Sequence, residues 1–197
     1  MLMDPVGRRL VLVSGPPGAG KTSIAGPLAA ELGFTLLAKD RIKETLHDTL
    51  GQDEADLAWS RRLGAASIEL LWVLAADAPA VVLEANFWPD DPRPEARLRR
   101  LGTAPVEVHC VCPVEECIRR YSVRGPARHP VHVDSHELRT APEAFAMSAR
   151  PLGLGPVISV DTTRTVDIKD LARQVRLLLP GSFDAEQRAS SSPSPAG

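Results

Sequence analysis

The octapeptide GPPGAGKT, residues 15–22, combines the residue types and the spacing best suited to chemistry in this sequence. Four apolar residues, LVLV, stand just before Ser14, and a helical pattern follows the loop. Its glycines allow consecutive backbone N–H groups to point at one anion, and a helix start adds partial positive charge. The spacing G-x-x-x-x-G-K-[ST] is that of a phosphate-binding loop. We therefore expect a nucleotide triphosphate to bind here.

The side chains of this loop have distinct expected roles. Lys21 is expected to reach the β- and γ-phosphates and to act in catalysis, while the Thr22 hydroxyl holds Mg²⁺. A glycine-rich turn that only packs a helix on a sheet would not explain the lysine and the threonine. The remaining expected nucleotide contacts are Gly15, Pro16, Pro17, Gly18, Ala19, Gly20 and Ser23. The expected cofactors are ATP and Mg²⁺.

Two carboxylates are associated with other apolar runs. Asp40 follows the run 34–38, and Glu84 lies in the run 80–85. Because the carboxyl ends of parallel strands meet at one sheet edge, both would lie beside the phosphate loop. Asp40 would then accept a proton from an incoming hydroxyl or ligate Mg²⁺ through water, and Glu84 would lie near Mg²⁺. Alternatively, Asp40 only N-caps a helix that begins at Arg41.

Residues that follow these acids are candidates for binding the acceptor of a phosphoryl group. Lys43 could meet substrate or phosphate, and Asn86, Phe87 and Trp88 would line a pocket. Trp88 could equally fill the core. Three further contacts are expected from the helix predicted over 54–77: Trp59, Arg61 and Arg62.

Short apolar runs alternate with helical patterns along the chain. The runs are predicted strands over 9–14, 34–38, 80–85, 106–111 and 157–162. Helices are predicted over about 20–32, 41–50, 54–77, 92–101, 113–124 and 167–179. This alternation predicts an α/β fold with right-handed crossovers and a parallel sheet covered on both faces. Gly26 and Pro27 predict a kink or local loosening in the first helix.

The segment 125–155 is rich in proline and charge and lacks strand character, which predicts a lid or substrate element. Three histidines lie close together within it: His129, His132 and His136. They could contact substrate, hold a metal or be solvated. Residues 181–197 form a low-complexity tail that we expect to be disordered. The prediction is thus a single P-loop domain over 1–180.

Composition excludes several classes of protein. Hydrophobic residues make up 44% of the chain, as in a globular fold. A net charge of −2 and only 4% aromatic residues argue against binding of a nucleic-acid strand. The three cysteines fit neither a zinc nor a disulfide framework, so we expect reduced core thiols. Without a signal peptide or an apolar span, we expect a cytoplasmic protein with no membrane partner.

Together these segments resemble the small P-loop kinases of the AAA_33, or predicted-kinase, group. Relatives of that group include chloramphenicol phosphotransferase, gluconate kinase, zeta toxin and the kinase half of polynucleotide kinase. The matching segments, within residues 9–178, are GPPGAGKTS, LLAKDRIKETL, VVLEANF, CPVEECIRRYSVRG and VISVDTT. The resemblance implies a three-layer sandwich whose parallel sheet has five strands in the order 2-3-1-4-5. It also implies phosphoryl transfer to a hydroxyl, with Asp40 as catalytic base.

The resemblance also implies roles for residues late in the chain. Arg120 and Arg124, four residues apart, fall on one helix face. Arginines here in such kinases clamp the transferring phosphoryl group and stack near adenine, whereas the alternative is a solvated helix face. The residues expected to close around the nucleotide base are Asp161, Thr162 and Thr163. Glu84 stands where such proteins more often carry aspartate.

The expected function is therefore an ATP-dependent kinase that moves the γ-phosphoryl group to a hydroxyl of a small molecule. Two alternatives stay open: a nucleoside or polynucleotide 5′-hydroxyl kinase, and a nucleotide-dependent switch without catalysis. The acid at position 40, the paired arginines and the long lid favour an acceptor pocket over a switch. Sugar, antibiotic, nucleoside and amino-alcohol hydroxyls all stay open as acceptors, as does the oligomeric state.

Overall fold

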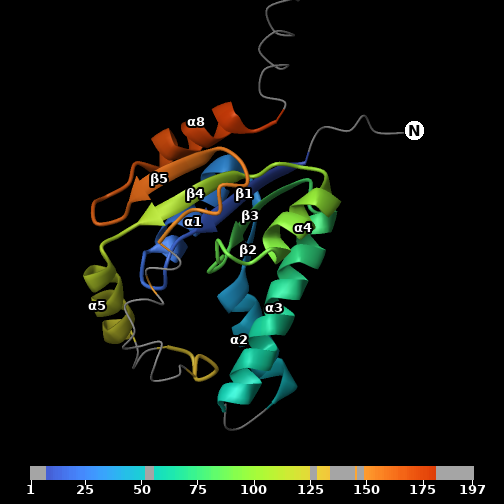
Figure 1. The fold of residues 1–197 in the computed structure, drawn as a ribbon, viewed down its shortest axis with the longest axis vertical. Coiled ribbons are helices and arrows are strands. Elements are labelled where there is room, and N and C mark those ends of the chain that lie inside the picture. The colour runs from blue at the N-terminus through green and yellow to red at the C-terminus, as the bar shows by residue number, and fades with distance from the viewer. Residues whose placement is uncertain (1–7, 52–55, 125–127, 134–144, 146–148, 181–197) are drawn as a thin grey trace, which may run out of the picture.

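A five-stranded parallel sheet in the order β2-β3-β1-β4-β5 forms the centre of the computed structural model (Figure 1). The structure describes residues 8–51, 56–124, 128–133, 145 and 149–180. The strands are β1 (Arg9–Ser14), β2 (Thr35–Ala38), β3 (Ala80–Glu84), β4 (Val106–Val111) and β5 (Val157–Asp161). The helices are α1 (Lys21–Leu32), α2 (Lys39–Leu50), α3 (Leu57–Asp77), α4 (Arg93–Leu101), α5 (Val114–Arg124) and α8 (Ile168–Leu178). The expected α/β fold and its strand order are confirmed.

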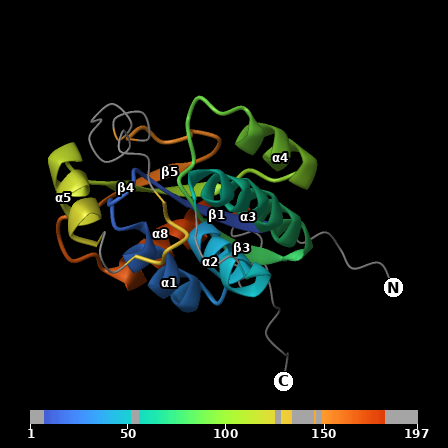
Figure 2. The same cartoon turned by 90° about the horizontal axis from the view of Figure 1, so that it is seen from below.

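The central strand β1 divides the core into two layers because successive side chains point to opposite faces of a sheet. Val11 and Val13 pack with residues of α1 and α8. Leu10 and Leu12 pack with residues of α3 and α4 on the other face. Figure 2 shows these two pairs of helices on opposite sides of the sheet. The sandwich therefore has three layers, and its parallel strands all end at one edge.

Helix α1 runs without interruption from Lys21 to Leu32, although Pro27 lies inside it. Proline removes one backbone donor and clashes with the preceding turn, which favours a kink. Here Ile24 and Leu28 are buried against the sheet on the inner face. The loosening expected from the sequence does not interrupt the helix, because this buried face holds both halves on the sheet.

Helix α2 begins at Lys39, two residues earlier than the sequence predicts. Ala38 is the residue before the helix, and no side chain caps this end. Asp40 therefore lies in the first turn, where its charge still complements the helix dipole. The alternative that Asp40 only N-caps a helix starting at Arg41 is wrong, because the backbone is already helical at position 39.

A buried polar network connects the end of β1 to the segment that leads into β5. The Ser14 hydroxyl donates to Glu107 Oε1 at 2.5 Å, and two backbone N–H groups of residues 152–153 donate to the same carboxylate at 2.9 and 3.0 Å. His109 contacts Ser14 and the carbonyl of Ala149, both at 2.9 Å. Three donors satisfy the fully buried carboxylate of Glu107. The network positions the base of the phosphate loop relative to 149–153.

Parts of the predicted lid, 125–155, pack against the body of the protein. Val131 is fully buried, and Phe145 is buried in edge contact with Tyr121. The other lid residues, 125–127, 134–144 and 146–148, lie outside the described residues, as does the predicted tail. The division into a kinase domain, a lid and a tail stays a prediction.

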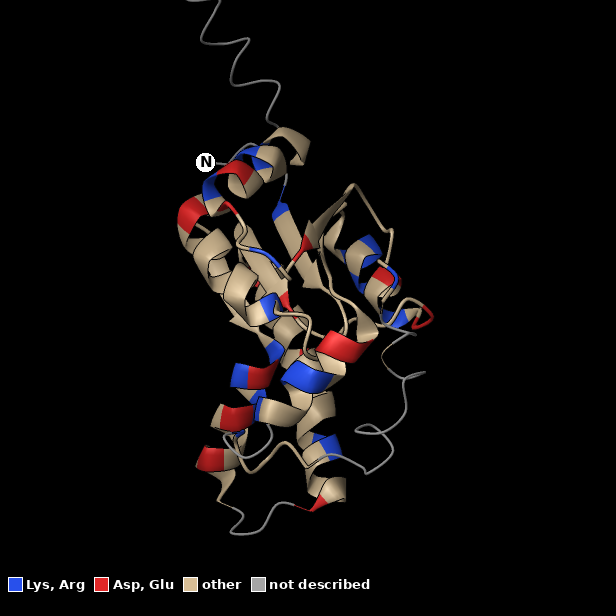
Figure 3. Ribbon diagram, turned by 90° about the vertical axis from the view of Figure 1, so that its left-hand side faces the viewer, with Lys and Arg blue, Asp and Glu red and all other residues tan. Residues whose placement is uncertain are grey.

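Charges of both signs are interspersed over the helices in the view of Figure 3. This distribution agrees with the small net charge and offers no single basic face in that view. None of the helices in the described segments combines the length and the hydropathy that a membrane-spanning helix requires.

The three cysteines provide a test of the packing beneath the phosphate loop. Cys110, Cys112 and Cys117 are buried and free, and burial raises the pKa of Cys110 and of Cys117 to about 12. At pH 8 only about one thiol in ten thousand with such a pKa is ionised, and the thiolate is the reactive form. We expect Ellman's reagent to modify the native protein slowly and to titrate three thiols promptly in denaturant. Rapid modification of the native protein would contradict this packing.

Candidate active site

The phosphate loop, residues 15–22, connects β1 to α1, and its glycines adopt a backbone conformation that other residues avoid. The φ angles of Gly15, Gly18 and Gly20 are 130°, 80° and 83°. A Cβ on Gly18 would lie 2.2 Å from the carbonyl oxygen of Cys117. The close approach of the loop to α5 therefore requires glycine. The other predicted nucleotide-binding residues of this segment lie in the loop or the first turn of α1: Pro16, Pro17, Ala19, Thr22 and Ser23.

The Lys21 ammonium is folded back over the loop. Its Nζ donates to the carbonyl oxygens of Gly15 and Pro16, both at 2.9 Å. Burial lowers the pKa of Lys21, while Coulombic attraction, first of all from Glu84, acts to raise it. An ammonium has three N–H donors, and these carbonyls occupy two of them. A phosphate in the loop would therefore meet a buried positive charge with a donor to offer.

Thr22 and Glu84, which the sequence predicts to organise a metal, lie in direct contact. The Thr22 hydroxyl donates to Glu84 Oε1 at 2.7 Å. Burial raises the pKa of Glu84, while the hydrogen bond from Thr22 and the charge of Lys21 act to lower it. A hydroxyl and a carboxylate are oxygen ligands of the kind that Mg²⁺ prefers. The residues present fit that cation.

No group of three or more His, Cys, Asp or Glu side chains within the described segments is arranged to hold a metal ion. Magnesium usually keeps several waters and takes one or two carboxylates together with substrate phosphates. The Thr22–Glu84 pair therefore suits Mg²⁺ that arrives with a nucleotide better than a permanently bound metal.

Asp40 carries a negative charge beside this site. Its carboxylate is more than half exposed and accepts from Lys39 Nζ at 3.0 Å. Partial burial acts to raise the pKa of Asp40, but Lys39, His132 and Lys21 outweigh it, so the pKa lies below its ordinary value. The group is ionised at neutral pH. Sequence reasoning missed Lys39 as its partner, although the two residues are adjacent.

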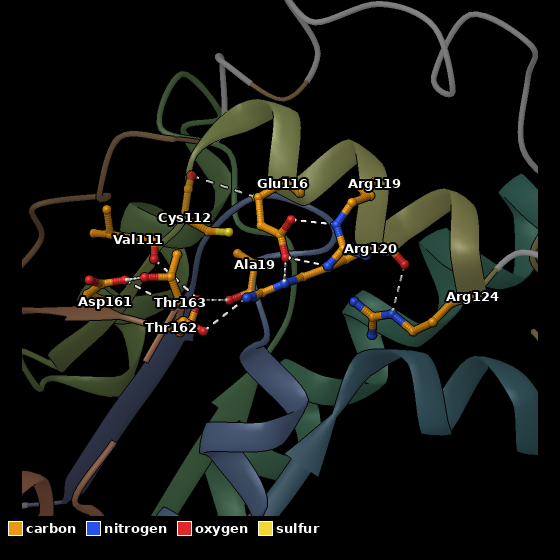
Figure 4. A network of polar contacts seen from close by, with 11 residues as sticks. Ala19, Val111, Cys112, Glu116, Arg119, Arg120, Arg124, Asp161, Thr162 and Thr163 are labelled. Atoms are coloured by element: carbon orange, nitrogen blue, oxygen red, sulfur yellow. Dashed lines mark hydrogen bonds and ion pairs between the residues drawn. The ribbon is translucent and has the colours of Figure 1, made fainter. Parts of the chain in front are cut away.

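The two predicted arginines of α5 lie close to the phosphate loop (Figure 4). Arg120 donates from Nε to Glu116 at 2.7 Å and from Nη2 to the carbonyl of Thr162 at 3.2 Å. A Cβ on Gly20 would lie 3.7 Å from Arg120 Nη1. Arg124 is near enough to Glu84 for its positive charge to act against the rise in the pKa of that carboxyl. Arg120 therefore lies against the phosphate loop, and contact of either arginine with a transferring phosphoryl group stays a prediction.

Residues at the end of β5 close the other side of the loop. The Thr162 hydroxyl donates to the Ala19 carbonyl at 2.7 Å. Asp161 accepts from the amide and the hydroxyl of Thr163 at 2.9 and 2.6 Å, as Figure 4 shows. Thr162 thus contacts the loop directly, while Asp161 and Thr163 bond to each other. Contact of these three residues with a nucleotide base stays a prediction.

A cavity of about 470 Å³, here called the α3 cavity, lies at the same edge of the sheet. Asn86, Phe87 and Trp88 follow β3 and line it together with residues of α3 and α4. Lys39 enters from the start of α2. Trp88 is half-buried at the cavity wall, whereas Phe87 is buried in the core. The three residues predicted to line an acceptor pocket therefore share one cavity.

Other predicted acceptor contacts are distributed unevenly. Arg61 lines the α3 cavity, but Lys43 is not among its lining residues. The buried ammonium of Lys43 donates to the Ser60 hydroxyl at 2.7 Å, which joins α2 to α3. Trp59 donates to His47 at 3.1 Å, and Arg62 lies over the Trp59 ring.

Two of the three lid histidines rest on α2. His129 Nε2 lies 3.0 Å from a carboxylate oxygen of Asp48, and His132 Nε2 lies 2.7 Å from one of Glu44. Burial lowers the pKa of His132, against the effect of Glu44 and Asp40. The two acids, four residues apart on one helix face, were a sequence signal that reasoning missed. His136 lies outside the described residues.

The arrangement has counterparts among known proteins. Residues 10–147 match the AAA_33 family, described as an AAA domain. A candidate kinase from Chloroflexus aurantiacus is 31% identical, with a TM-score of 0.74 over 87% of this chain and 98% of that one. A cytidylate kinase of Nitratidesulfovibrio vulgaris is 27% identical over 152 residues, 75% of this chain. The chain spans 64% of the length of that curated relative.

Two further solved structures show the fold alone, because their sequences are distant. Shikimate kinase from Acinetobacter baumannii, in complex with shikimate, has a TM-score of 0.55 at 15% identity over 95% of this chain and 98% of that one. A gluconokinase from Sinorhizobium meliloti has a TM-score of 0.51 at 16% identity over 94% of this chain and 100% of that one. With phosphate loop, strand order and matched residues in agreement, the chain belongs to the AAA_33 family and has the fold of a P-loop kinase.

Proposed function

We propose that the protein transfers the γ-phosphoryl group of ATP to a hydroxyl group of a small molecule. The supporting observation is that three features share the carboxyl edge of the sheet. The phosphate loop follows β1, Asp40 lies just after β2, and the α3 cavity is lined by the residues after β3. In parallel α/β sheets this edge is where ligands bind. A donor site and an acceptor site can therefore adjoin across one carboxylate.

On the donor side, Lys21 and the loop N–H groups would hold the phosphates. Thr22 and Glu84 would hold Mg²⁺, which neutralises charge on the β- and γ-phosphate oxygens when bound. Arg120 is fixed against Gly20 by Glu116 and Thr162, so its charge needs little reorganisation as negative charge develops.

On the acceptor side, Asp40 would accept a hydrogen bond from the incoming hydroxyl. The oxygen of that hydroxyl forms a bond to the γ-phosphorus while the bond from the γ-phosphorus to the β–γ bridging oxygen breaks. The hydroxyl proton passes to Asp40, and ADP leaves. Because the pKa of Asp40 is lowered and phosphoryl transfer has a loose transition state, Asp40 would orient the hydroxyl and take its proton late.

A nucleotide acceptor is the second candidate. The 27% identity to a cytidylate kinase favours it, and the name of that relative implies a phosphate oxygen as acceptor. Trp88, which is half-buried at the cavity wall, would offer a nucleobase a ring against which to stack. The two candidates differ in their product, an acid-stable phosphate ester or an acid-labile phosphoanhydride. A switch without transfer would yield neither product.

The first test uses γ-labelled ATP, Mg²⁺ and a panel of hydroxyl compounds that also contains nucleoside monophosphates. The wild type is expected to yield a labelled, acid-stable product. Asp40→Asn should slow transfer about 10²- to 10⁴-fold, the range of general-base catalysis, and leave ATP affinity nearly unchanged. Transfer at the wild-type rate by Asp40→Asn would refute its role. ATP binding with no labelled acceptor would refute the kinase proposal and favour the switch.

Gly64→Leu tests whether the α3 cavity is the acceptor site. Gly64 lines the α3 cavity, and a Cβ there would meet nothing closer than Lys39 Nζ at 4.0 Å. Because glycine is unfavourable inside a helix, the Gly64→Leu variant should fold well. The leucine side chain would extend into the cavity. We expect a raised KM for the acceptor with unchanged ATP binding. An unchanged acceptor KM would place the acceptor elsewhere.

The metal assignment predicts a pH effect. Glu84 must be ionised to hold Mg²⁺, and burial raises its pKa. As the pH falls, the wild type should lose Mg²⁺ affinity in the presence of ATP earlier than an ordinary glutamate with a pKa of 4.5 would allow. Glu84→Gln should weaken Mg²⁺ affinity about 10- to 100-fold and remove this pH dependence. If Glu84→Gln binds Mg²⁺ with the wild-type affinity at every pH, the assignment of Glu84 to the metal is wrong.

A further inference from the structure

We propose that the acceptor carries an anionic group, a carboxylate or a phosphate, which binds Arg61 in the α3 cavity. This inference rests on the proposed function, because it takes the α3 cavity to be the acceptor site. It deepens that proposal by naming a substrate class: a small hydroxylated anion with an apolar face.

The charges that line the cavity are unequal in number and in pairing. The cations are Lys39, Arg61, Arg93 and Arg97, and the acids are Glu69 and Asp91. Arg97 pairs with Glu69, and Arg93 pairs with Asp91 at 2.8 Å. Lys39 pairs with Asp40, outside the cavity lining. Within the described part of the chain, Arg61 alone of these four cations has neither an ion pair nor a hydrogen bond.

The sequence around Arg61 explains why its charge is not neutralised by its own helix. Ion pairs on a helix form between residues three or four apart. The residues at those positions are Leu57, Ala58, Gly64 and Ala65, none of which is acidic. Arg61 is exposed and its own helix offers it no acid, so its guanidinium donors are open to a partner from outside the helix.

Two small residues, Gly64 and Ala65, leave space open beside the Arg61 guanidinium group. Gly64 and Ala65 line the cavity one helical turn beyond Arg61. Glycine inside a helix is less favourable than alanine. Packing does not require it here, since the nearest atom to a Cβ on Gly64 would be Lys39 Nζ at 4.0 Å. A ligand that needs this space beside Arg61 accounts for glycine at position 64.

The other walls indicate how such an acceptor would lie. The apolar side chains are Ile68, Trp72, Phe87 and Trp88, and Asn86 adds an amide. Ala38 pairs with Glu84 in the sheet, so Lys39 and Ala85 emerge from neighbouring strands beside the phosphate site. The hydroxyl would point to that end, toward Asp40, and the anionic group to Arg61. A volume of about 470 Å³ suits a small molecule.

The test uses γ-labelled ATP and matched pairs of hydroxyl compounds. One member of each pair carries a carboxylate or phosphate, and the other is its neutral amide or alcohol counterpart. We expect labelled product from anionic members, with kcat/KM at least about tenfold above that of their neutral partners. Equal labelling of both members would overturn this inference and leave the proposed function standing. If no compound is labelled, the proposed function itself fails.

Variants then locate the anion. Arg61→Gln should raise KM for the best anionic acceptor about 10- to 100-fold, leave KM for ATP unchanged, and reduce the preference over its neutral partner. Arg61→Lys should restore part of the affinity, because it keeps charge but loses the planar fork. Arg100→Gln, an exposed arginine of α4 outside the cavity lining, is the control for loss of surface charge. An Arg61→Gln enzyme that keeps the wild-type preference would overturn the assignment.

Discussion

The burial of one ammonium group organises the candidate site. Lys21 sits in a loop whose glycines bring backbone carbonyls within 2.9 Å of its Nζ, and desolvation disfavours its charge. The charge is kept by acids at the ends of neighbouring strands, first among them Glu84. The loop, β2 and β3 therefore form one electrostatic unit. A triphosphate bound in the loop would add negative charge beside the buried Lys21 ammonium and so stabilise its charged form.

The same electrostatics separates the roles of the two carboxylates. Glu84 is buried, bonded to Thr22, and has a raised pKa, whereas Asp40 is partly exposed, paired with Lys39, and has a lowered pKa. A carboxylate that bonds the loop threonine suits a metal, and one that stays ionised beside Lys39, a residue of the cavity lining, suits a hydroxyl. Neighbouring strands thus present one acid to each half of the proposed transfer.

Local patterns were enough to predict the strands, the phosphate loop and the strand ends that surround it. Short runs with apolar residues on both faces are typical of strands in a parallel sheet that is covered on both sides. The phosphate-loop motif is recognisable because all its residues lie within one short segment. The start of α2 was misplaced because Ala38 offers no capping side chain to mark it. The pairing of Lys43 with Ser60 could not be read, since it depends on how α2 packs on α3. For Arg61 the sequence shows that its own helix offers no acid, but only the packing shows that no other residue in the described part of the chain pairs with it.

A structure of the protein with a non-hydrolysable ATP analogue and Mg²⁺ would test the account most directly. We expect the γ-phosphate to contact Lys21 and to face the α3 cavity, with Asp40 at the boundary between them. A triphosphate bound outside the loop, or a γ-phosphate turned away from the cavity, would contradict transfer to an acceptor held there.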